Sequence, residues 1–180
     1  MNSRRILDWD TRWTRRLRLQ PGQRFWGAAT FLAHSGDSWF WLAGLFIIWI
    51  LTQGQWHVRA ALLAMGVFGL AVVVMGIKFT VKRQRPEGEW GAIYRSTDPH
   101  SFPSGHAARA ALLAVMAAML GPAWFAVLVV LWAPLVCLAR ICTGMHYVID
   151  VIAGAVLGFF AGWVVMALMP VFFAWFPFLF

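Results

Sequence analysis

Charged side chains are scarce in this sequence: 12% of its 180 residues are Asp, Glu, Lys or Arg, and only 7 residues are acidic. An average soluble domain carries about twice that share of charge. The hydrophobic share is 61%, and the 12 tryptophans fit the enrichment of indole rings at membrane–water boundaries. The composition therefore favours an integral membrane protein over its main alternative, a soluble helical protein with a large core.

Cysteine and acidic residues are too few to suggest a disulfide framework or a bound metal ion. Cys137 and Cys142 both lie in or beside an apolar block, where a free cysteine behaves as a small buried hydrophobe. The 7 carboxylates are scattered, which argues against a two-metal clamp. The N-terminus also lacks an apolar core followed by a small-residue cleavage site, so no cleavable signal peptide is expected. We predict that the protein uses no metal and no other cofactor.

The basic residues that are present are unevenly spread. The net charge is +8, seven of the 15 basic residues precede Gly27, and five more cluster around one loop: Lys78, Lys82, Arg83, Arg85 and Arg95. Nothing here builds the basic face of a soluble nucleic-acid-binding domain, so nucleic acid is excluded as a partner. The membrane bilayer, with its anionic headgroups, and a phosphate-bearing substrate explain the charge better.

The apolar blocks predict an all-α, polytopic membrane bundle that forms one domain over residues 1–180. Over residues 3–20, Ile6, Trp9, Trp13 and Leu17 recur at helical spacing between arginines, as expected of an amphipathic helix in the interface plane. A solvated tail is the alternative. A short helix is expected at 24–34, followed by about five transmembrane helices, near 39–52, 58–80, 105–120, 121–142 and 146–169.

The one long polar connection runs over residues 81–105, and a loop of this length between packed helices is usually functional. Counting membrane crossings places both ends of this loop on the same face as the end of the fourth span and the start of the fifth. The N-terminus lies on that face too. We therefore interpret 81–105 as an active-site loop.

Three cations stand at the ends of apolar blocks on this face: Lys78, Arg85 and Arg140. Ionisable residues close to the hydrocarbon core of a membrane are energetically costly and often functional. Lys78 or Arg85 taken alone would be interpreted as a cation at a helix end that extends its charge to the membrane surface. Ser104 and Gly105 add backbone amides at a predicted helix N-terminus. Converging cations and amides are what the binding of a tetrahedral oxyanion requires.

Two histidines complete this pattern. His146 and Asp150 stand four residues apart, so on a helix the carboxylate can hold one ring nitrogen and leave the other as a nucleophile. A helix-capping histidine beside a satisfied aspartate is the alternative. His106 follows the Gly105 turn and can protonate a departing alkoxide. The hypothesis is that His146 attacks phosphorus, a phosphohistidine forms, and water hydrolyses it.

Lys78 with Arg85-Pro86, then Pro103-Ser104-Gly105-His106, then Arg140, His146 and Asp150 resemble the three ordered motifs of the type 2 phosphatidic acid phosphatase family. This family includes bacterial lipid phosphatases and vanadium haloperoxidases. The resemblance implies a helical bundle and metal-independent dephosphorylation, with His146 as nucleophile, Asp150 as its partner and His106 as acid. It also implies phosphate binding by Lys78, Arg85, Ser104, Gly105 and Arg140. Two departures are Ala139, where the family often has serine, and one transmembrane helix fewer than many bacterial members.

The sequence thus predicts an integral membrane phosphatase acting on a lipid phosphate or diphosphate: a polyprenyl phosphate or diphosphate, phosphatidate or phosphatidylglycerol phosphate. A lipid phosphotransferase and a non-catalytic lipid-binding protein are the alternatives. Arg109, one turn after His106, is a candidate for a further phosphate contact or a headgroup anchor. The resemblance implies a multi-pass protein of a bacterial inner membrane. The positive-inside rule predicts that the basic N-terminus lies in the cytoplasm. The site, which is expected on the same face of the membrane, would then open to the cytoplasm too.

Overall fold

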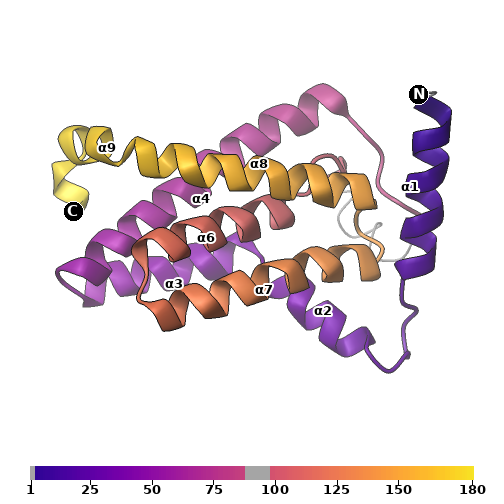
Figure 1. Cartoon of the computed structure of the whole chain (residues 1–180), viewed down its shortest axis with the longest axis horizontal. Coiled ribbons are helices and arrows are strands. Elements are labelled where there is room, and N and C mark those ends of the chain that lie inside the picture. The colour runs from indigo at the N-terminus through magenta and orange to yellow at the C-terminus, as the bar shows by residue number, and fades with distance from the viewer. Residues whose placement is uncertain (1–2, 88–97) are drawn as a thin grey trace.

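The computed structural model describes residues 3–87 and 98–180, so part of the predicted 81–105 loop, including Arg95, lies outside the described residues. The described elements are helical apart from one isolated bridge between Gln84 and His100, which confirms the all-α prediction. The helices are α1 (Ser3–Leu17), α2 (Trp26–Ser35), α3 (Ser38–Leu51), α4 (Gln55–Val81), α6 (Gly105–Leu120), α7 (Ala123–Cys142), α8 (Val148–Ala167) and α9 (Met169–Trp175), with a 3₁₀ turn at Pro177–Leu179 (Figure 1).

Three of these helices, α4, α7 and α8, are long and apolar enough to cross a membrane. Helices α3 and α6 are apolar but shorter, with 14 and 16 residues. The structure therefore supports a membrane helical bundle with three long candidate spans, and five crossings stay a prediction. The last span begins at Val148, so that His146 lies in the turn before the helix and not on it.

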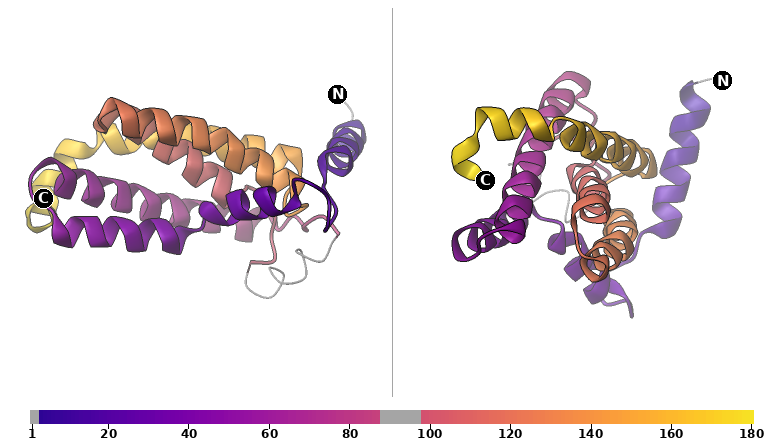
Figure 2. Two further views of the ribbon diagram at one scale, coloured as in Figure 1. Left: turned by 90° about the horizontal axis from the view of Figure 1, so that it is seen from below. Right: turned by 60° about the vertical axis from the view of Figure 1, so that its left-hand side comes forward.

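Helix α6 lies at the centre of the bundle, packed against α4, α7 and α8 (Figure 2). Helix α3 packs on α4, and α2 packs on α7. Helix α1 runs across one end of the bundle, where it contacts α7 and α8, and the C-terminus lies at the other end (Figure 1). The polar junctions of the chain therefore gather at the end that α1 covers.

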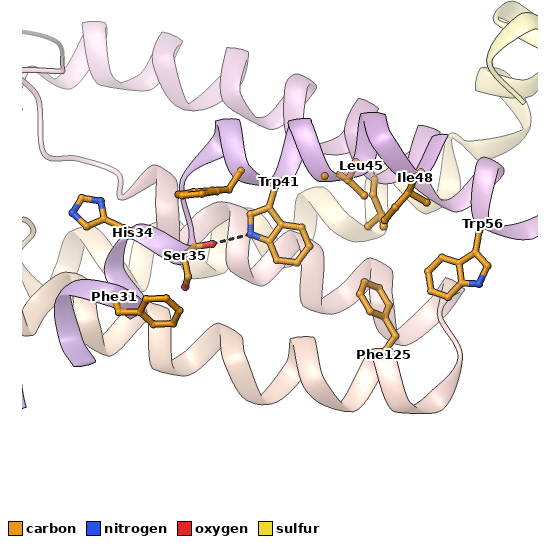
Figure 3. A pocket seen from close by; sticks show the side chains of 12 residues that line it. Phe31, His34, Ser35, Trp41, Leu45, Ile48, Trp56 and Phe125 are labelled. Carbon is orange, nitrogen blue, oxygen red and sulfur yellow. Dashed lines mark hydrogen bonds between the residues drawn. The ribbon is translucent and has the colours of Figure 1, made fainter. Parts of the chain in front are cut away.

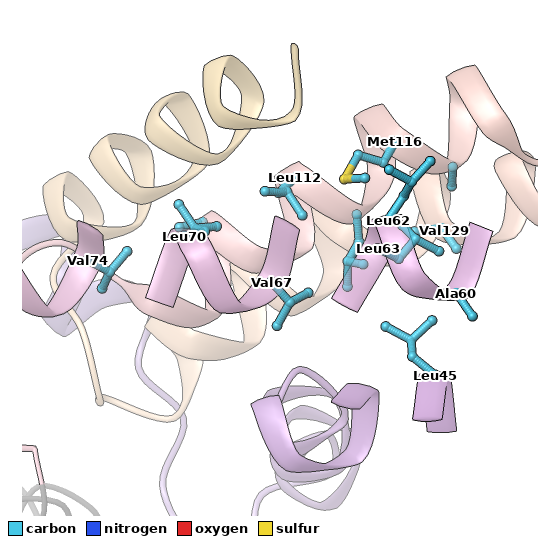
Figure 4. Close-up of a cluster of buried hydrophobic side chains, with 13 residues drawn as sticks. Leu45, Ala60, Leu62, Leu63, Val67, Leu70, Val74, Leu112, Met116 and Val129 are labelled. Carbon is cyan, nitrogen blue, oxygen red and sulfur yellow. The ribbon is translucent and has the colours of Figure 1, made fainter. Parts of the chain in front are cut away.

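The main core cluster lies where α4 faces α6, around the fully buried Leu62, Leu112 and Met116 (Figure 4). The outer surface is apolar as well, since Phe68, with 67% of its area exposed, and Phe160, with 61%, point away from the core. Both inner and outer faces are thus apolar, as expected of helices surrounded by lipid.

Three glycines on α8 allow its backbone to approach α6 closely. A Cβ added at Gly154 would lie 2.4 Å from the Ser104 carbonyl oxygen, and one at Gly158 would lie 1.8 Å from the Ala108 carbonyl oxygen. Gly162 continues this stripe at the same spacing of four residues. Small residues at this spacing are a common device of membrane helix pairs. Because the two helices touch along this stripe, the start of α8 is held beside the start of α6, and the Ser104 amide donates to the Asp150 carbonyl at 2.9 Å.

Helix α1 confirms the predicted N-terminal helix, and it packs on the bundle through polar residues that the prediction did not single out. Trp9 and Trp13 remain 42% and 41% exposed, whereas Asp10 and Thr14 are buried against the bundle. The physical reason is that the start of α8 presents unpaired backbone amides, which need polar acceptors. The indole rings are left on the outside, where they are free to contact the membrane interface.

Candidate active site

Four helix ends meet at the end of the bundle that α1 covers. Lys78 lies on the last turn of α4, and Arg140 lies on the last turn of α7. Ser104 caps α6, with its hydroxyl oxygen accepting from the Ala107 amide at 3.4 Å. His146 lies two residues before the first residue of α8. Residues from widely separated motifs therefore lie in one region.

A cavity of about 200 Å³ lies at these helix ends, with Lys78 and His146 among its lining residues. It is also lined by Gly105 and His106, so both histidines face the same space. Its remaining wall comes mainly from apolar side chains on one face of α4, namely Val67, Leu70, Ala71, Val74 and Met75. The cavity thus combines polar and charged groups, which also include Asp98, Ser38 and Arg109, with an apolar wall from α4.

His146 is fully enclosed, and its two ring nitrogens have different partners. Nδ1 lies 2.9 Å from the Ser101 carbonyl oxygen, so Nδ1 carries the proton. Nε2 lies 3.3 Å from Arg85 Nη1 and therefore accepts with its lone pair. Asp150 Oδ2 is 3.7 Å from Nδ1, too far for a hydrogen bond. The Ser101 carbonyl thus fixes the tautomer of His146, a role that the sequence analysis assigned to Asp150.

The electrostatic surroundings keep His146 neutral. Burial lowers its pKa well below the usual histidine value, and the nearby charges of Arg140, Arg85 and Lys78 lower it further. A neutral imidazole that carries a lone pair on Nε2 is the form that can act as a nucleophile once the substrate takes the place of the Arg85 contact.

Two of the predicted phosphate-binding cations share one carboxylate. Asp98 Oδ2 accepts from Lys78 Nζ at 2.5 Å and from Arg85 Nη2 at 2.8 Å. The sequence analysis did not single out Asp98, because nothing in the local pattern links it to residues 13 and 20 positions away. A carboxylate between two cations shows that this position favours an oxyanion.

His106 has a carboxylate partner that the sequence analysis also missed. Its Nε2 lies 2.5 Å from Oδ1 of Asp37, in the two-residue link between α2 and α3, and Asp37 Oδ2 lies 3.2 Å from His34 Nδ1. Burial raises the pKa of Asp37, but interactions with the two histidines outweigh it and hold the pKa below its usual value. The sequence did offer one signal for this role, because Asp37 is the single carboxylate in the short polar break between two apolar segments.

Arg109 lines the cavity, but its guanidinium is engaged elsewhere. It donates to the Gly36 carbonyl oxygen, in the link that carries Asp37, and to the hydroxyl oxygen of Ser38, the first residue of α3. Arg109 thus makes structural contacts, and its role as a phosphate contact or a headgroup anchor stays a prediction. Arg109 fixes the α2–α3 link against α6, and so sets where Asp37 meets His106.

A larger cavity of about 390 Å³ lies between α2, α3, the start of α4 and the start of α7 (Figure 3). It is lined mainly by aromatic and aliphatic side chains, among them Trp41, whose Nε1 donates to the Ser35 carbonyl oxygen at 3.1 Å. His34 is the one ionisable residue among its lining side chains. The reactive groups are therefore in the smaller cavity.

The apolar helical bundle and the cationic, histidine-bearing cavity define a membrane protein with a site suited to a phosphate group. Comparison with known families agrees, because residues 57–174 match the PAP2 superfamily. The chain therefore belongs to the PAP2 superfamily, whose phosphatases are hydrolases that act on phosphoester bonds.

Curated relatives are similar over most of the chain. An undecaprenyl-diphosphatase of Sulfolobus acidocaldarius is 28% identical over 137 residues, which are 73% of this chain and 65% of that protein. A decaprenylphosphoryl-5-phosphoribose phosphatase of Mycobacterium tuberculosis is 34% identical over 139 residues, 74% of this chain and 75% of that protein. The chain thus spans just under two thirds of the first relative and three quarters of the second.

Solved structures show the same fold. A transmembrane PAP2 type phosphatidylglycerolphosphate phosphatase from Bacillus subtilis aligns with a TM-score of 0.75 and 22% identity, covering 94% of this chain and 89% of that one. Aquifex aeolicus LpxE aligns with a TM-score of 0.68 and 22% identity, covering 87% of this chain and 94% of that one.

Proposed function

We propose that this PAP2 protein is an integral membrane phosphatase that removes phosphate from a lipid phosphate or lipid diphosphate through a phosphohistidine on His146. The observation that carries the proposal is the 200 Å³ cavity, which is lined both by His146, His106 and Lys78 and by an apolar wall of α4. A phosphate with an apolar tail matches both kinds of lining.

The chemistry follows from the two histidines. His146 Nε2 attacks phosphorus and forms the P–N bond, while the P–O bond to the lipid breaks and His106 gives its proton to the leaving oxygen. Water then attacks phosphorus, His106 takes its proton, and the P–N bond breaks to release phosphate and neutral His146. His106 must therefore start protonated, and the proton that it takes from the attacking water restores this form, so the two steps balance.

The negative charge of the transferred group is balanced by fixed cations and amides. Lys78, Arg85 and Arg140 surround His146 and would stabilise the equatorial oxygens, with the Gly105 amide at the start of α6 as a further donor. The Ser104 amide already donates to the Asp150 carbonyl oxygen, so the part of Ser104 is to cap α6. When phosphate enters, Lys78 and Arg85 exchange the Asp98 carboxylate for phosphate oxygens. Asp150 acts from the first turn of α8 as a charged neighbour of His146.

The apolar wall supports a lipid substrate. From Lys78 back to Val67 the cavity follows α4 for 11 residues, about 16 Å at 1.5 Å per residue, which suits a hydrocarbon chain. The relatives named above act on polyprenyl-linked substrates, and the Bacillus subtilis structure is of a phosphatidylglycerolphosphate phosphatase. Polyprenyl phosphates and diphosphates, phosphatidate and phosphatidylglycerol phosphate form the substrate panel.

The test is phosphate release from that panel by the purified protein, with a labelled lipid phosphate to trap the intermediate. His146→Ala should lose both phosphate release and acid-labile protein labelling, whereas His57→Gln, at the far end of α4, should retain both. Undiminished release by His146→Ala would refute the covalent mechanism. Transfer of the label to an added acceptor lipid in place of water would identify a phosphotransferase.

The same proposal includes a topology. Helices α3, α4, α6, α7 and α8 would cross the membrane, with α1 in the interface and the site open to the cytoplasm of a bacterial inner membrane. Helix α6 spans about 24 Å at 1.5 Å per residue, less than a core of about 30 Å, so its start at the site would lie below headgroup level. Labelling of Ser3→Cys by a membrane-impermeant thiol reagent in intact cells would refute the cytoplasmic assignment.

A further inference from the structure

Helix α1 carries a buried carboxylate where an amphipathic surface helix would be expected to carry none. Asp10 is fully buried, although Asp8, two residues earlier, is exposed and Trp9 between them is 42% exposed. Burial of a carboxylate is costly unless it is paired and hydrogen-bonded. Asp10 therefore needs partners, and the structure shows three polar links that lead from it to the site.

The first two links form one chain of charges. Asp10 Oδ2 accepts from Arg83 Nη2 at 2.7 Å, and the other arm of the same guanidinium, Nη1, donates to Asp150 Oδ1 at 2.6 Å. The guanidinium also lies over the Tyr147 ring, 4.1 Å from its centroid. Burial lowers the pKa of Arg83, but the two carboxylates outweigh it and raise the pKa, so the bridge stays charged.

The third link concerns the backbone at the start of α8. The Ile149 amide donates to Asp10 Oδ1 at 3.0 Å, and the Val148 amide donates to the Thr14 hydroxyl oxygen at 3.2 Å. The Tyr147 amide donates to Asp150 Oδ2 at 3.0 Å. The first amides of a helix have no partner within it. Here two of these three are satisfied by side chains of α1, which lies across the end of the bundle (Figure 1).

From this geometry we infer that Asp10 is a positioning residue: through Arg83 and the Ile149 amide it holds Asp150 and the start of α8, and thereby sets the place of His146. This inference rests on the proposed function of His146 as nucleophile. It assigns to the N-terminal helix, which lies outside the matched region 57–174, a direct part in the site.

The physical consequence is a loss of alignment when the bridge is broken. Without the Asp10 charge, Arg83 is balanced by Asp150 alone and can turn towards it, which shifts the first turn of α8 next to His146. A displacement of about 1 Å of a reacting group can cost roughly 10²-fold in rate. Asp10 does not line the cavity, so substrate binding should change far less than turnover.

The test compares Asp10→Asn with Asp8→Asn in the full-length protein, using the lipid phosphate from the panel that the wild type cleaves. Asparagine keeps an oxygen for the Ile149 amide but removes the charge that binds Arg83. We expect kcat to fall about 10- to 100-fold with KM within about threefold of the wild type. Asp8→Asn should match the wild type, and both variants should melt within about 3 °C of it.

Two further variants separate positioning from folding. Arg83→Lys keeps the charge but lacks the two guanidinium nitrogens that contact Asp10 and Asp150 separately, so it should reproduce the loss in kcat. The double variant Asp10→Asn/Arg83→Lys should lose no more than either single variant, because both break one bridge. Should Asp10→Asn fail to fold, Arg83→Lys alone decides the matter.

Wild-type kcat in Asp10→Asn or in Arg83→Lys would overturn the inference, and so would a double variant whose losses multiply. A rise in KM without a fall in kcat would also overturn it, because that result assigns Asp10 to substrate binding. Absence of phosphate release by the wild type would instead refute the proposed function. The two failures are therefore distinguishable.

Discussion

Substitution of one glycine in the contact between α6 and α8 should disturb both the fold and the site. The Cβ of Gly158→Ala would lie 1.8 Å from the Ala108 carbonyl oxygen, whereas real Cβ atoms essentially never approach another atom closer than 3.0 Å. The obstacle is backbone, so no side-chain rotation relieves it. The two helices must separate locally by about 1.2 Å, the difference between the two distances.

The magnitude follows from that displacement. Overpacking of this kind costs about 1 to 3 kcal/mol, which for a chain of this size lowers the melting temperature by about 2 to 12 °C. Helix α6 carries His106 and α8 carries Asp150, so separation of the helices also misaligns the site. A shift of about 1 Å there predicts a fall in kcat of roughly 10²-fold.

The assay is thermal unfolding in detergent followed by phosphate release from the preferred lipid at temperatures where both proteins are folded. Gly69→Ala is the matched control, since Gly69 lies on the outer face of α4 and its added Cβ would meet no atom within 4 Å. The control should melt at or slightly above the wild-type temperature, because alanine favours helix over glycine. If Gly158→Ala behaves like the control in both measurements, the close contact of α6 and α8 is wrong.

Three further predictions concern the polar groups. Asp37→Asn should lower kcat about tenfold or more for a lipid alkoxide leaving group, because His106 loses the partner that orients it as an acid. The loss should be smaller for 4-nitrophenyl phosphate, whose leaving group needs no proton. Equal losses on both substrates would contradict this role. Asp98→Asn removes the carboxylate that is shared by Lys78 and Arg85 and that competes with a bound anion. The inhibition constant of orthovanadate should therefore fall by about tenfold, or about 1.4 kcal/mol. An unchanged or higher constant would show that Asp98 does not compete with the anion. Because the pKa of His146 is lowered, its neutral, nucleophilic form is kept at acidic pH. The fall in kcat/KM on the acid side of the pH profile should therefore have its midpoint below pH 6.5. A midpoint at or above that value would count against the neutral nucleophile.

The helical segments were largely predictable from local pattern. Apolar runs and their polar breaks placed α2, α3, α4, α6 and α7 within a few residues of their observed ends, because burial in lipid demands continuous apolar stretches. The start of α8 was placed two residues early, since the residues around His146 form a turn that hydrophobicity does not distinguish from a helix end. The Gly154, Gly158, Gly162 spacing was visible as a small-residue stripe and would have predicted which face of α8 meets α6.

The partners of the site residues were not predictable in the same way. The sequence analysis paired His146 with Asp150 because they are four residues apart, yet the Ser101 carbonyl, 45 positions away, holds the ring nitrogen. Asp37 meets His106 across 69 positions, and Asp10 meets Arg83 across 73. Such contacts join separate helices, and no periodicity within one segment records them.

By itself, the order of residues determined that the chain is a helical membrane protein and which cations and histidines stand at helix ends on one side, since composition and spacing are local properties. Only the tertiary structure decided which carboxylate contacts which basic side chain. Asp98 contacts Lys78 and Arg85, and Asp37 contacts His106. Asp10 and Asp150 both contact Arg83. The reason is physical. A buried charge takes whichever opposite charge the packed helices bring within about 3 Å, and that choice depends on how the helices cross.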